Sequence, residues 1–134
     1  AAPQAQADQF RQYYGNWTYH PQYNYHYCHY YYKPTPTVTT YHHHYCICRP
    51  SQPRYIYYYN PHRRVYWGRF DLEGKPGHQY SLLEEKDRKP SLADIPESAF
   101  PTPGAMPVIP DSQDSVAISP PPPAPTQDRP EATK

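Results

Sequence analysis

The chain is poor in the aliphatic residues that fill ordinary protein cores. Leu, Ile, Val and Phe together make up about 12% of its 134 residues. A share below about 20% is typical of disorder when the net charge is also high. Here the net charge is only +1, and 17 tyrosines supply apolar area. The composition therefore predicts a small fold built around phenol rings and excludes a large enzyme domain.

Long hydrophobic runs and catalytic motifs are missing as well. No apolar stretch approaches the roughly 20 residues that span a bilayer. The chain has no Gly-x-Ser-x-Gly, no His-Glu-x-x-His and no glycine-rich phosphate loop, and Asp8 is the only carboxylate among residues 1–70. A catalytic histidine needs a carboxylate to orient it. We therefore predict neither a membrane span nor an enzyme.

The first residues have the small side chains found around a signal-peptidase cleavage site. Residues 1–7 read Ala-Ala-Pro-Gln-Ala-Gln-Ala, which is typical of a mature, exported chain. Asn16 begins an Asn-Trp-Thr acceptor for N-linked glycans. O-linked sugars are expected on threonines in Pro/Thr-rich settings, and these are Thr35, Thr37, Thr39, Thr40, Thr102 and Thr126.

Two stretches alternate with a period of two. Residues 23–28 and 41–48 are rich in tyrosine and histidine and contain all three cysteines. This period places alternate side chains on opposite faces of a strand. Prolines at 34 and 36 fit a long connection between strands. The pattern predicts an antiparallel hairpin.

A second group of strands follows. Residues 55–59 end at Asn60-Pro61, which favours a turn, and residues 65–70 return. Residues 73–77 contain two glycines and form a further turn before residues 78–83. We predict a three-stranded meander.

Beyond Glu84 prolines become frequent. Ser91-Leu92-Ala93-Asp94 resembles a helix start that Pro96 limits to about one turn. The densest run is typical of polyproline II, and it consists of Pro120, Pro121, Pro122, Pro123 and Pro125. The expected fold is a mostly β, Tyr-rich hairpin and meander domain at residues 13–89. An extension at residues 1–12 precedes it, and an extended Pro-rich arm at residues 90–134 follows it.

The cysteines and histidines permit two interpretations. A hairpin centred near residues 33–38 would bring Cys28 opposite Cys46 or Cys48, and a cross-strand disulfide is the leading hypothesis. The third cysteine is then left over for an intermolecular bond or a free thiol.

A metal site for Cu or Zn is the alternative, because thiolate and imidazole suit both ions. Its candidate ligands lie on one face of the strand at residues 41–48 or on the strand paired with it. They are His26, His42, His44, Cys46 and Cys48. Four ligands at every second residue of one strand are spread too far for a single tetrahedral ion. At most two or three are expected to converge.

Charge divides the chain into unlike halves. Residues 1–70 hold seven Lys or Arg against one acid, and residues 71–134 hold six against eleven. Such asymmetry suggests that one half meets an acidic partner, and the nearest one is the other half, of this chain or of a neighbouring copy. Binding of single-stranded nucleic acid or another polyanion by the basic, aromatic half is a second alternative.

The aromatic and proline-rich halves suggest a receptor and its ligand, because polyproline II segments dock on aromatic grooves. The expected receptor residues are Tyr55, Tyr57, Tyr59, Tyr66 and Trp67, and the expected ligand is the run Pro120, Pro121, Pro122, Pro123 and Pro125. An arm that crosses to the next copy makes a head-to-tail contact, which generates a filament. We therefore expect an extracellular structural protein that assembles with itself into filaments or surface layers.

Several motifs resemble one family. In order, they are Tyr57–Pro61, Val65–Asp71, Tyr80–Leu83, Lys86–Lys89, Asp94–Pro101 and Pro103–Pro107. They resemble an uncharacterised family of exported Tyr/Pro-rich proteins of planctomycete-type bacteria over residues 55–110. The resemblance implies a bacterial, non-cytoplasmic protein and brings no catalytic residues with it.

Overall fold

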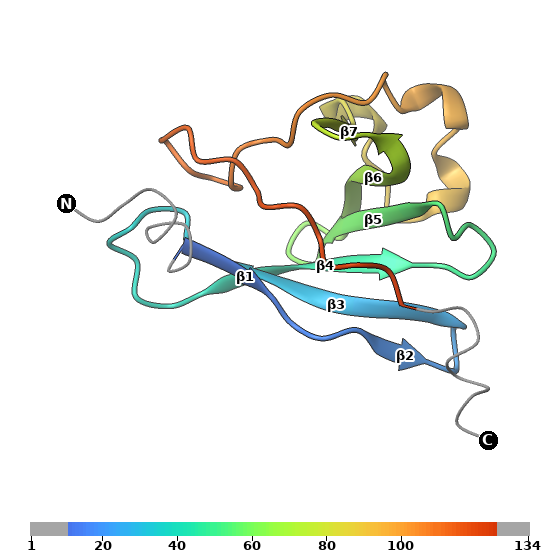
Figure 1. Ribbon diagram of the computed structural model, residues 1–134, viewed down its shortest axis with the longest axis horizontal. Coiled ribbons are helices and arrows are strands. Elements are labelled where there is room, and N and C mark those ends of the chain that lie inside the picture. Colours follow the sequence, from blue (N-terminus) through green and yellow to red (C-terminus); the bar gives the residue numbers. More distant parts are fainter. Residues whose placement is uncertain (1–10, 126–134) are drawn as a thin grey trace.

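The computed structural model describes residues 11–125 of the chain. In this range the protein is mostly antiparallel β-sheet, as predicted (Figure 1). The strands are β1 (Gln12–Tyr14), β2 (Thr18–His20), β3 (Tyr25–Tyr32), β4 (His42–Cys48), β5 (Tyr55–Asn60), β6 (Val65–Lys75) and β7 (His78–Leu82). They are followed by the 3₁₀ turns η1 (Glu85–Asp87), η2 (Leu92–Asp94) and η3 (Glu97–Ala99).

Both predicted strand groups are confirmed. β3 and β4 form the long hairpin, in which Cys28 pairs with Cys46. β5, β6 and β7 form the meander. At its first turn the Asn60 side chain accepts from the backbone amides of His62 and Arg63, which is how asparagine stabilises a turn. At the second turn, Gly77 has a φ of +86°, a conformation that glycine adopts without steric strain.

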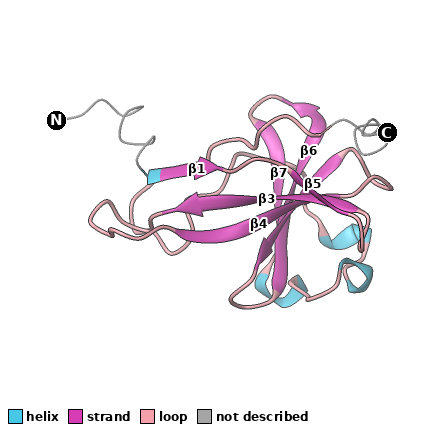
Figure 2. Ribbon diagram, turned by 90° about the horizontal axis from the view of Figure 1, so that it is seen from below, coloured by secondary structure: helices cyan, strands magenta, loops and turns pink. Residues whose placement is uncertain are grey.

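The hairpin and the meander belong to one sheet, because β4 also pairs with β5. The strand order is β1-β3-β4-β5-β6-β7, and β2 pairs with the same edge of β3 as β1 does. The sheet curls strongly, so that β5, β6 and β7 cross β3 and β4 steeply in Figure 2. A sheet that curls in this way encloses a core on its concave face.

Residues 101–125, here called the C-terminal strap, cover the open side of this curl. The strap first pairs with β7, where the amide of Gly104 donates to the Tyr80 carbonyl at 2.8 Å. It then buries Ile109 and Ile118 in the core. It finally passes β1, as the orange-to-red trace in Figure 1 shows. The strap thus joins the two ends of the sheet.

The extended arm predicted for residues 90–134 is not shown in its described part, residues 90–125, which lies against the body. Prolines lack an amide donor but keep a carbonyl acceptor, and donors of the body reach these acceptors. Ser81 donates to the Pro101 carbonyl at 2.7 Å, and the Trp17 indole donates to the Pro123 carbonyl at 2.8 Å. Arg11 and Ile95 are buried, and the domain limits at residues 13 and 90 stay predictions.

Two apolar clusters lie on opposite faces of the sheet. The concave cluster contains Tyr30, Tyr32, Tyr58, Trp67 and Tyr80 together with the strap isoleucines. The convex cluster packs Tyr57, Tyr66 and Ile47 under Leu83 and Ile95. The predicted helix start is confirmed there as η2, whose Ser91 side chain accepts from the Ala93 amide. The three largest fully buried side chains are tyrosines, Tyr30, Tyr32 and Tyr58, in agreement with the composition.

Gln12 of β1 connects the core to the strap. Its side-chain amide donates to the Ala117 carbonyl at 3.0 Å, and its carbonyl accepts from Tyr30 Oη at 2.5 Å and from the Ser119 amide at 3.1 Å. Gln12 is itself buried. Since buried polar groups that lose a partner lose about 1–3 kcal/mol each, this side chain is a clamp for the strap.

We expect Gln12→Ala to release the strap before the rest of the fold. The free energy of unfolding should fall by about 2–4 kcal/mol, and amide exchange should rise selectively over residues 116–123. Hydrogen exchange followed by mass spectrometry measures this, with Gln22→Ala at an exposed turn as the matched control. Unchanged protection of residues 116–123 would contradict the clamp.

Candidate functional site

β3 and β4 separate their side chains cleanly onto two faces. His26, Cys28, Tyr30 and Tyr32 of β3 are buried on the concave face, and the residues between them are partly exposed on the convex face. β4 places His44, Cys46 and Cys48 on the concave face, opposite the β3 set. This confirms the predicted sharing of one face by the histidines and cysteines.

The three cysteines are buried thiols. Cys28 lies directly opposite Cys46, one of the two pairings predicted, but all three cysteines are free in the structure. Burial raises the pKa of Cys46 and Cys48, so these groups are thiols rather than thiolates at neutral pH. The predicted disulfide is therefore not formed here, although its register is present.

The predicted metal ligands do not converge. His44 bonds through Nε2 to Tyr32 Oη at 3.1 Å, and His42 lies exposed further along the strand. His26 pairs in register with Cys48, at the far end of β4 from His42. Within residues 11–125 no group of three or more His, Cys, Asp or Glu side chains has a geometry that could hold a metal ion. The reason is the strand spacing, which separates alternate residues by nearly 7 Å.

Four of the five predicted aromatic docking residues lie together on the convex face, and they are Tyr55, Tyr57, Tyr59 and Tyr66. Their rings contact one another in series, with Tyr55 to Tyr57 at 6.0 Å, Tyr57 to Tyr66 at 6.4 Å and Tyr59 to Tyr66 at 4.9 Å between ring centres. Tyr57 and Tyr66 are buried in this cluster. Trp67 belongs to the concave core instead, so it cannot share a surface with the other four.

The predicted proline ligand lies against its own chain, near other aromatic residues. Trp17 donates to the Pro123 carbonyl, and Tyr14 donates to the Ser119 carbonyl at 2.7 Å. Aromatic rings with a hydrogen-bond donor and proline-rich backbone do pair, as the chemistry of the two halves predicts, but within one chain. In the run itself, the half-buried members are Pro121, Pro122 and Pro125, and the exposed ones are Pro120 and Pro123.

Within one chain, this run does not lie on the predicted receptor, and its docking on a neighbouring copy stays a prediction. The β1–β2 region of the same chain holds the segment around Pro120, Pro121, Pro122, Pro123 and Pro125. The predicted receptor residues Tyr55, Tyr57, Tyr59, Tyr66 and Trp67 belong to β5 and β6. The physical reason is that Trp17 and Tyr14 offer the donors that these proline-rich carbonyls need.

The unlike charges of the two halves also meet within the chain. Arginines of the first half pair with acids of the second half, and the pairs are Arg11–Asp114, Arg54–Asp71, Arg63–Glu85 and Arg69–Glu97. The guanidinium partners lower the pKa of Asp71, Glu97 and Asp114. The acidic partner predicted for the basic half is therefore the second half of this chain.

A continuous layer of rings covers the convex face of β1, β3 and β4. We call it the tyrosine–histidine face, and it comprises Tyr13, Tyr25, Tyr27, His29, Tyr31, His43 and Tyr45. Its rings contact one another along and across the strands: Tyr13 to Tyr31 at 4.7 Å, His29 to His43 at 5.1 Å and His43 to Tyr45 at 5.5 Å between ring centres. Burial, with His29 and His62 nearby, lowers the pKa of His43. Most of this face is therefore neutral and aromatic.

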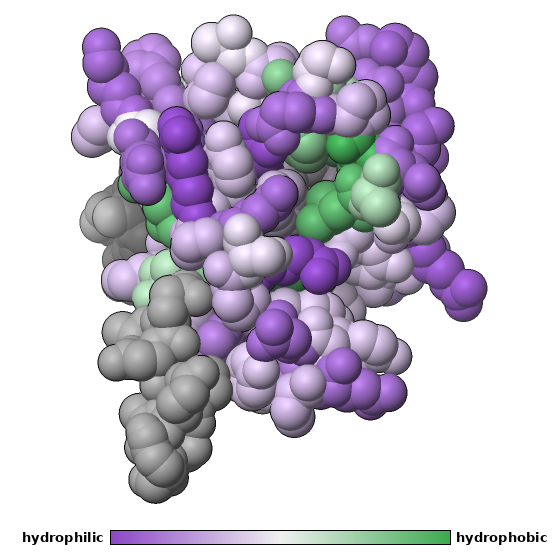
Figure 3. Space-filling model, turned by 90° about the vertical axis from the view of Figure 1, so that its right-hand side faces the viewer, coloured by the Kyte–Doolittle hydropathy of each residue, from purple (hydrophilic) through white to green (hydrophobic). Residues whose placement is uncertain are grey.

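A groove of about 500 Å³ lies beside this face. Its walls are mainly phenol rings with one guanidinium, and they include Tyr23, Tyr25, Tyr27, Tyr45, Tyr59, Tyr66 and Arg49. Tyr23 is 58% exposed and Tyr13 is 46% exposed. On the side drawn in Figure 3, the strongly apolar areas are small and separated by hydrophilic side chains. Tyrosine rings rather than aliphatic side chains therefore form most of the surface of this groove.

The sequence predicted two of the residues that line this groove as surface residues, Tyr59 and Tyr66, and did not predict the others. The odd-numbered positions of residues 23–31 alternate with the buried ones, so the period-two pattern already placed them together on one face. Which face was convex depended on the curl of the sheet. The curl follows from the β4–β5 pairing and from the strap, and neither was predicted.

The candidate sugar sites are on the surface. Asn16, Thr37, Thr39, Thr40 and Thr102 are exposed, and Thr35 is half-buried in the β3–β4 connection. Thr126 lies outside the described residues. Because these side chains are exposed, burial does not block the attachment of a glycan to them. Glycosylation itself remains a prediction.

Comparisons with known proteins do not assign this site. No protein-family profile, curated protein or solved structure matches the chain. Within the described residues, none of the helices has the length and apolar character needed to cross a bilayer. The function therefore has to be argued from the surface itself.

Proposed function

We propose that this protein is an extracellular structural protein, without enzymatic activity, whose copies associate through the tyrosine–histidine face. The observation that carries this proposal is the layer of contacting aromatic rings on an open sheet face. Tyrosine is enriched at protein interfaces, and it provides rigid contact area with few rotatable bonds.

A second copy is the partner that this chemistry favours. A phenol ring offers a face, an edge and a hydroxyl that both donates and accepts, so one tyrosine-rich surface is complementary to another of the same kind. Such a contact between equal surfaces is the arrangement of a two-fold dimer. Larger assemblies then need a further contact, for which glycans are candidates.

Charge supports the same partner over a polyanion. Four of the six arginines of the basic half are paired with acids of their own chain. Arg49 lies over a ring of the tyrosine–histidine face, at 5.3 Å from the Tyr25 ring centre. Lys33 lies 4.7 Å from the ring centre of Tyr41, which contacts Tyr13 of this face. With a net charge of +1, two copies approach without strong repulsion.

Analytical ultracentrifugation over a wide concentration range tests the proposal. We expect reversible association of the full chain and at least a tenfold weaker association of the face variant Tyr13→Ser/Tyr23→Ser. This variant removes the exposed ring of the tyrosine–histidine face and the exposed ring of the adjoining groove, and aromatic hot spots of an interface are worth about 2 kcal/mol or more each. Leu82→Ser/Val108→Ser is the matched control, because both residues are similarly exposed but lie away from this face. Association of the control should be unchanged.

Two outcomes would overturn the proposal. One is a monomer at every concentration. The other is equal weakening by the face variant and the control, which would indicate general stickiness. Titration with a single-stranded oligothymidylate provides a separate arm. Saturable binding that the face variant abolishes, in a chain that stays monomeric, would assign the face to nucleic acid instead.

A further inference from the structure

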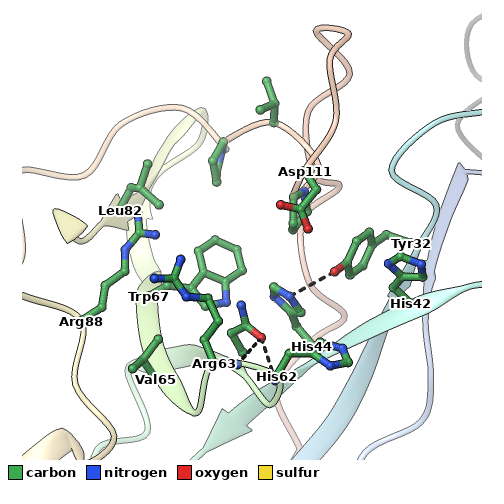
Figure 4. Close-up of a pocket in the computed structure, with 14 residues that line it drawn as sticks. Tyr32, His42, His44, His62, Arg63, Val65, Trp67, Leu82, Arg88 and Asp111 are labelled. Atoms are coloured by element: carbon green, nitrogen blue, oxygen red, sulfur yellow. Dashed lines mark hydrogen bonds between the residues drawn. The ribbon is translucent and has the colours of Figure 1, made fainter.

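A second concavity lies on the opposite side of the sheet, between the strand ends and the strap. It has a volume of about 530 Å³ and is walled by β4, the β5–β6 turn, the end of β7 and strap residues 107–111. Figure 4 shows its lining residues. Trp67, Val65, Leu82 and Val108 supply apolar walls. This size is within the range of sites for small organic molecules.

Trp67 at this cavity has a buried donor without a partner. The residue is 7% exposed, and its indole Nε1–H makes no hydrogen bond within the described protein. Its ring is fixed between Tyr58, at 5.3 Å, and His44, at 5.5 Å between ring centres. Since buried N–H groups nearly always have an acceptor, this indole is a donor that lacks its acceptor.

His44 beside it provides a second such group. The residue is 4% exposed, and burial lowers the pKa of its imidazole to about 3, so the ring is neutral. The Tyr32 hydroxyl is buried and bonds to Nε2 at 3.1 Å. A phenol proton directed at Nε2 makes that nitrogen the acceptor, so we assign the ring proton to Nδ1. Nδ1 is also buried without a partner.

The rim of the cavity carries positive charge. Arg63 and Arg88 line it, and both pair with Glu85, at 3.0 Å and 3.2 Å. On this wall two guanidiniums share one carboxylate, which leaves one positive charge there. Asp111 of the strap is the acid on the opposite wall (Figure 4). The deep donors therefore favour a ligand with acceptor oxygens, and the wall of Arg63 and Arg88 favours a negative charge close to it.

We propose that this cavity binds a small organic carboxylate with a planar apolar body, whose oxygens accept from Trp67 Nε1–H and His44 Nδ1–H. The apolar body lies against Val65, Leu82 and Val108, and the rim arginines attract the negative charge. The site is separate from the tyrosine–histidine face, so either can fail without the other. The ligand is defined by this chemistry, and benzoate is the probe that represents it.

Indole N–H resonances in a ¹H–¹⁵N NMR titration of the whole chain test this site. Benzoate should shift the Trp67 indole resonance in a saturable way. The Trp17 resonance should stay unchanged as an internal control, because that indole already donates to Pro123. Benzamide and benzylamine, which have the same ring without the negative charge, should bind at least tenfold more weakly.

Two variants extend the test. Trp67→Phe keeps an aromatic ring but removes the donor, and it should weaken benzoate binding at least tenfold, as measured by calorimetry. Asp111→Asn removes the opposing negative charge and should strengthen binding about threefold or more. Three results would overturn the proposal: no shift of Trp67 with benzoate, equal binding of benzamide, or unchanged affinity of Trp67→Phe.

Discussion

Gly68→Ala should destabilise the protein by about 2–4 kcal/mol. Gly68 lies in the middle of β6, paired with Tyr58 and Leu82. A Cβ atom at this position would be 2.3 Å from Tyr80 Oη and 2.5 Å from Tyr80 Cε1. The Tyr80 ring is buried against Tyr58 and Trp67 and has no free volume to move into. Overpacking of this kind typically costs 1–3 kcal/mol and sometimes more, and urea unfolding measures it.

Gly104→Ala is the matched control, because a Cβ atom there has no neighbour within 4 Å. It should change the free energy of unfolding by less than about 0.5 kcal/mol. In the double variant Gly68→Ala/Tyr80→Leu the ring is gone, so the two effects should be less than additive. Strict additivity would show that the contact between Gly68 and Tyr80 does not limit this position.

Stability should decrease as the pH falls from 6.5, and His44 should account for much of the loss. Burial, followed by His62, His43 and His42 nearby, lowers the pKa of His44 from 6.5 to about 3. Between these values the unfolded chain binds a proton at this residue and the folded chain does not. The free energy of unfolding therefore falls with decreasing pH, by about 1.4 kcal/mol per unit for one proton.

His44→Gln should flatten this dependence between pH 6.5 and 4.5, because glutamine does not titrate. Below that range the carboxylates with lowered pKa values, Asp71, Glu97 and Asp114, start to lose their charge and their arginine pairs. Their contribution to stability is present at neutral pH and disappears in acid. Unfolding curves at several pH values, with His78→Gln as the exposed control, measure the slope. An unchanged slope in His44→Gln would refute the assignment.

Local sequence patterns were sufficient for the strands but not for their assembly. The alternation of residues 23–28 and 41–48 and the Asn60-Pro61 turn predicted the hairpin and the first turn of the meander, because period and turn chemistry act within a few residues. The β4–β5 pairing joins two strands across a connection without a strong turn motif. The short strands β1 and β2 offered too few residues for a periodic pattern.

The C-terminal strap shows why composition misled. Prolines suggested an arm that stands away from the body, but the proline-rich segment also contains Ile95, Ile109 and Ile118, spaced far enough apart to escape notice as a pattern. Ile109 and Ile118 pack in the concave cluster, and Ile95 packs in the convex cluster. Burial of a single isoleucine is worth about 2 kcal/mol, so three anchors outweigh the extended preference of the prolines around them.

The sequence predicted the candidate site only in part, for a related reason. The concentration of aromatic residues identified the material of the surface, and the period identified which rings share a face. Whether a face points inward or outward is decided by the curl of the whole sheet. Trp67 was predicted to lie on the docking surface, but the curl of the sheet places it in the concave core.

The clamp between β1 and the strap also affects when the chain can fold. Arg11 reaches Asp114, Gln12 reaches Ala117, and Trp17 reaches Pro123, which are contacts between residues more than a hundred positions apart. During synthesis β1 leaves the ribosome long before the strap does and must wait for it. Since distant contacts slow folding, the sheet stays open on one side until the strap has been synthesised, and strap closure follows formation of the hairpins.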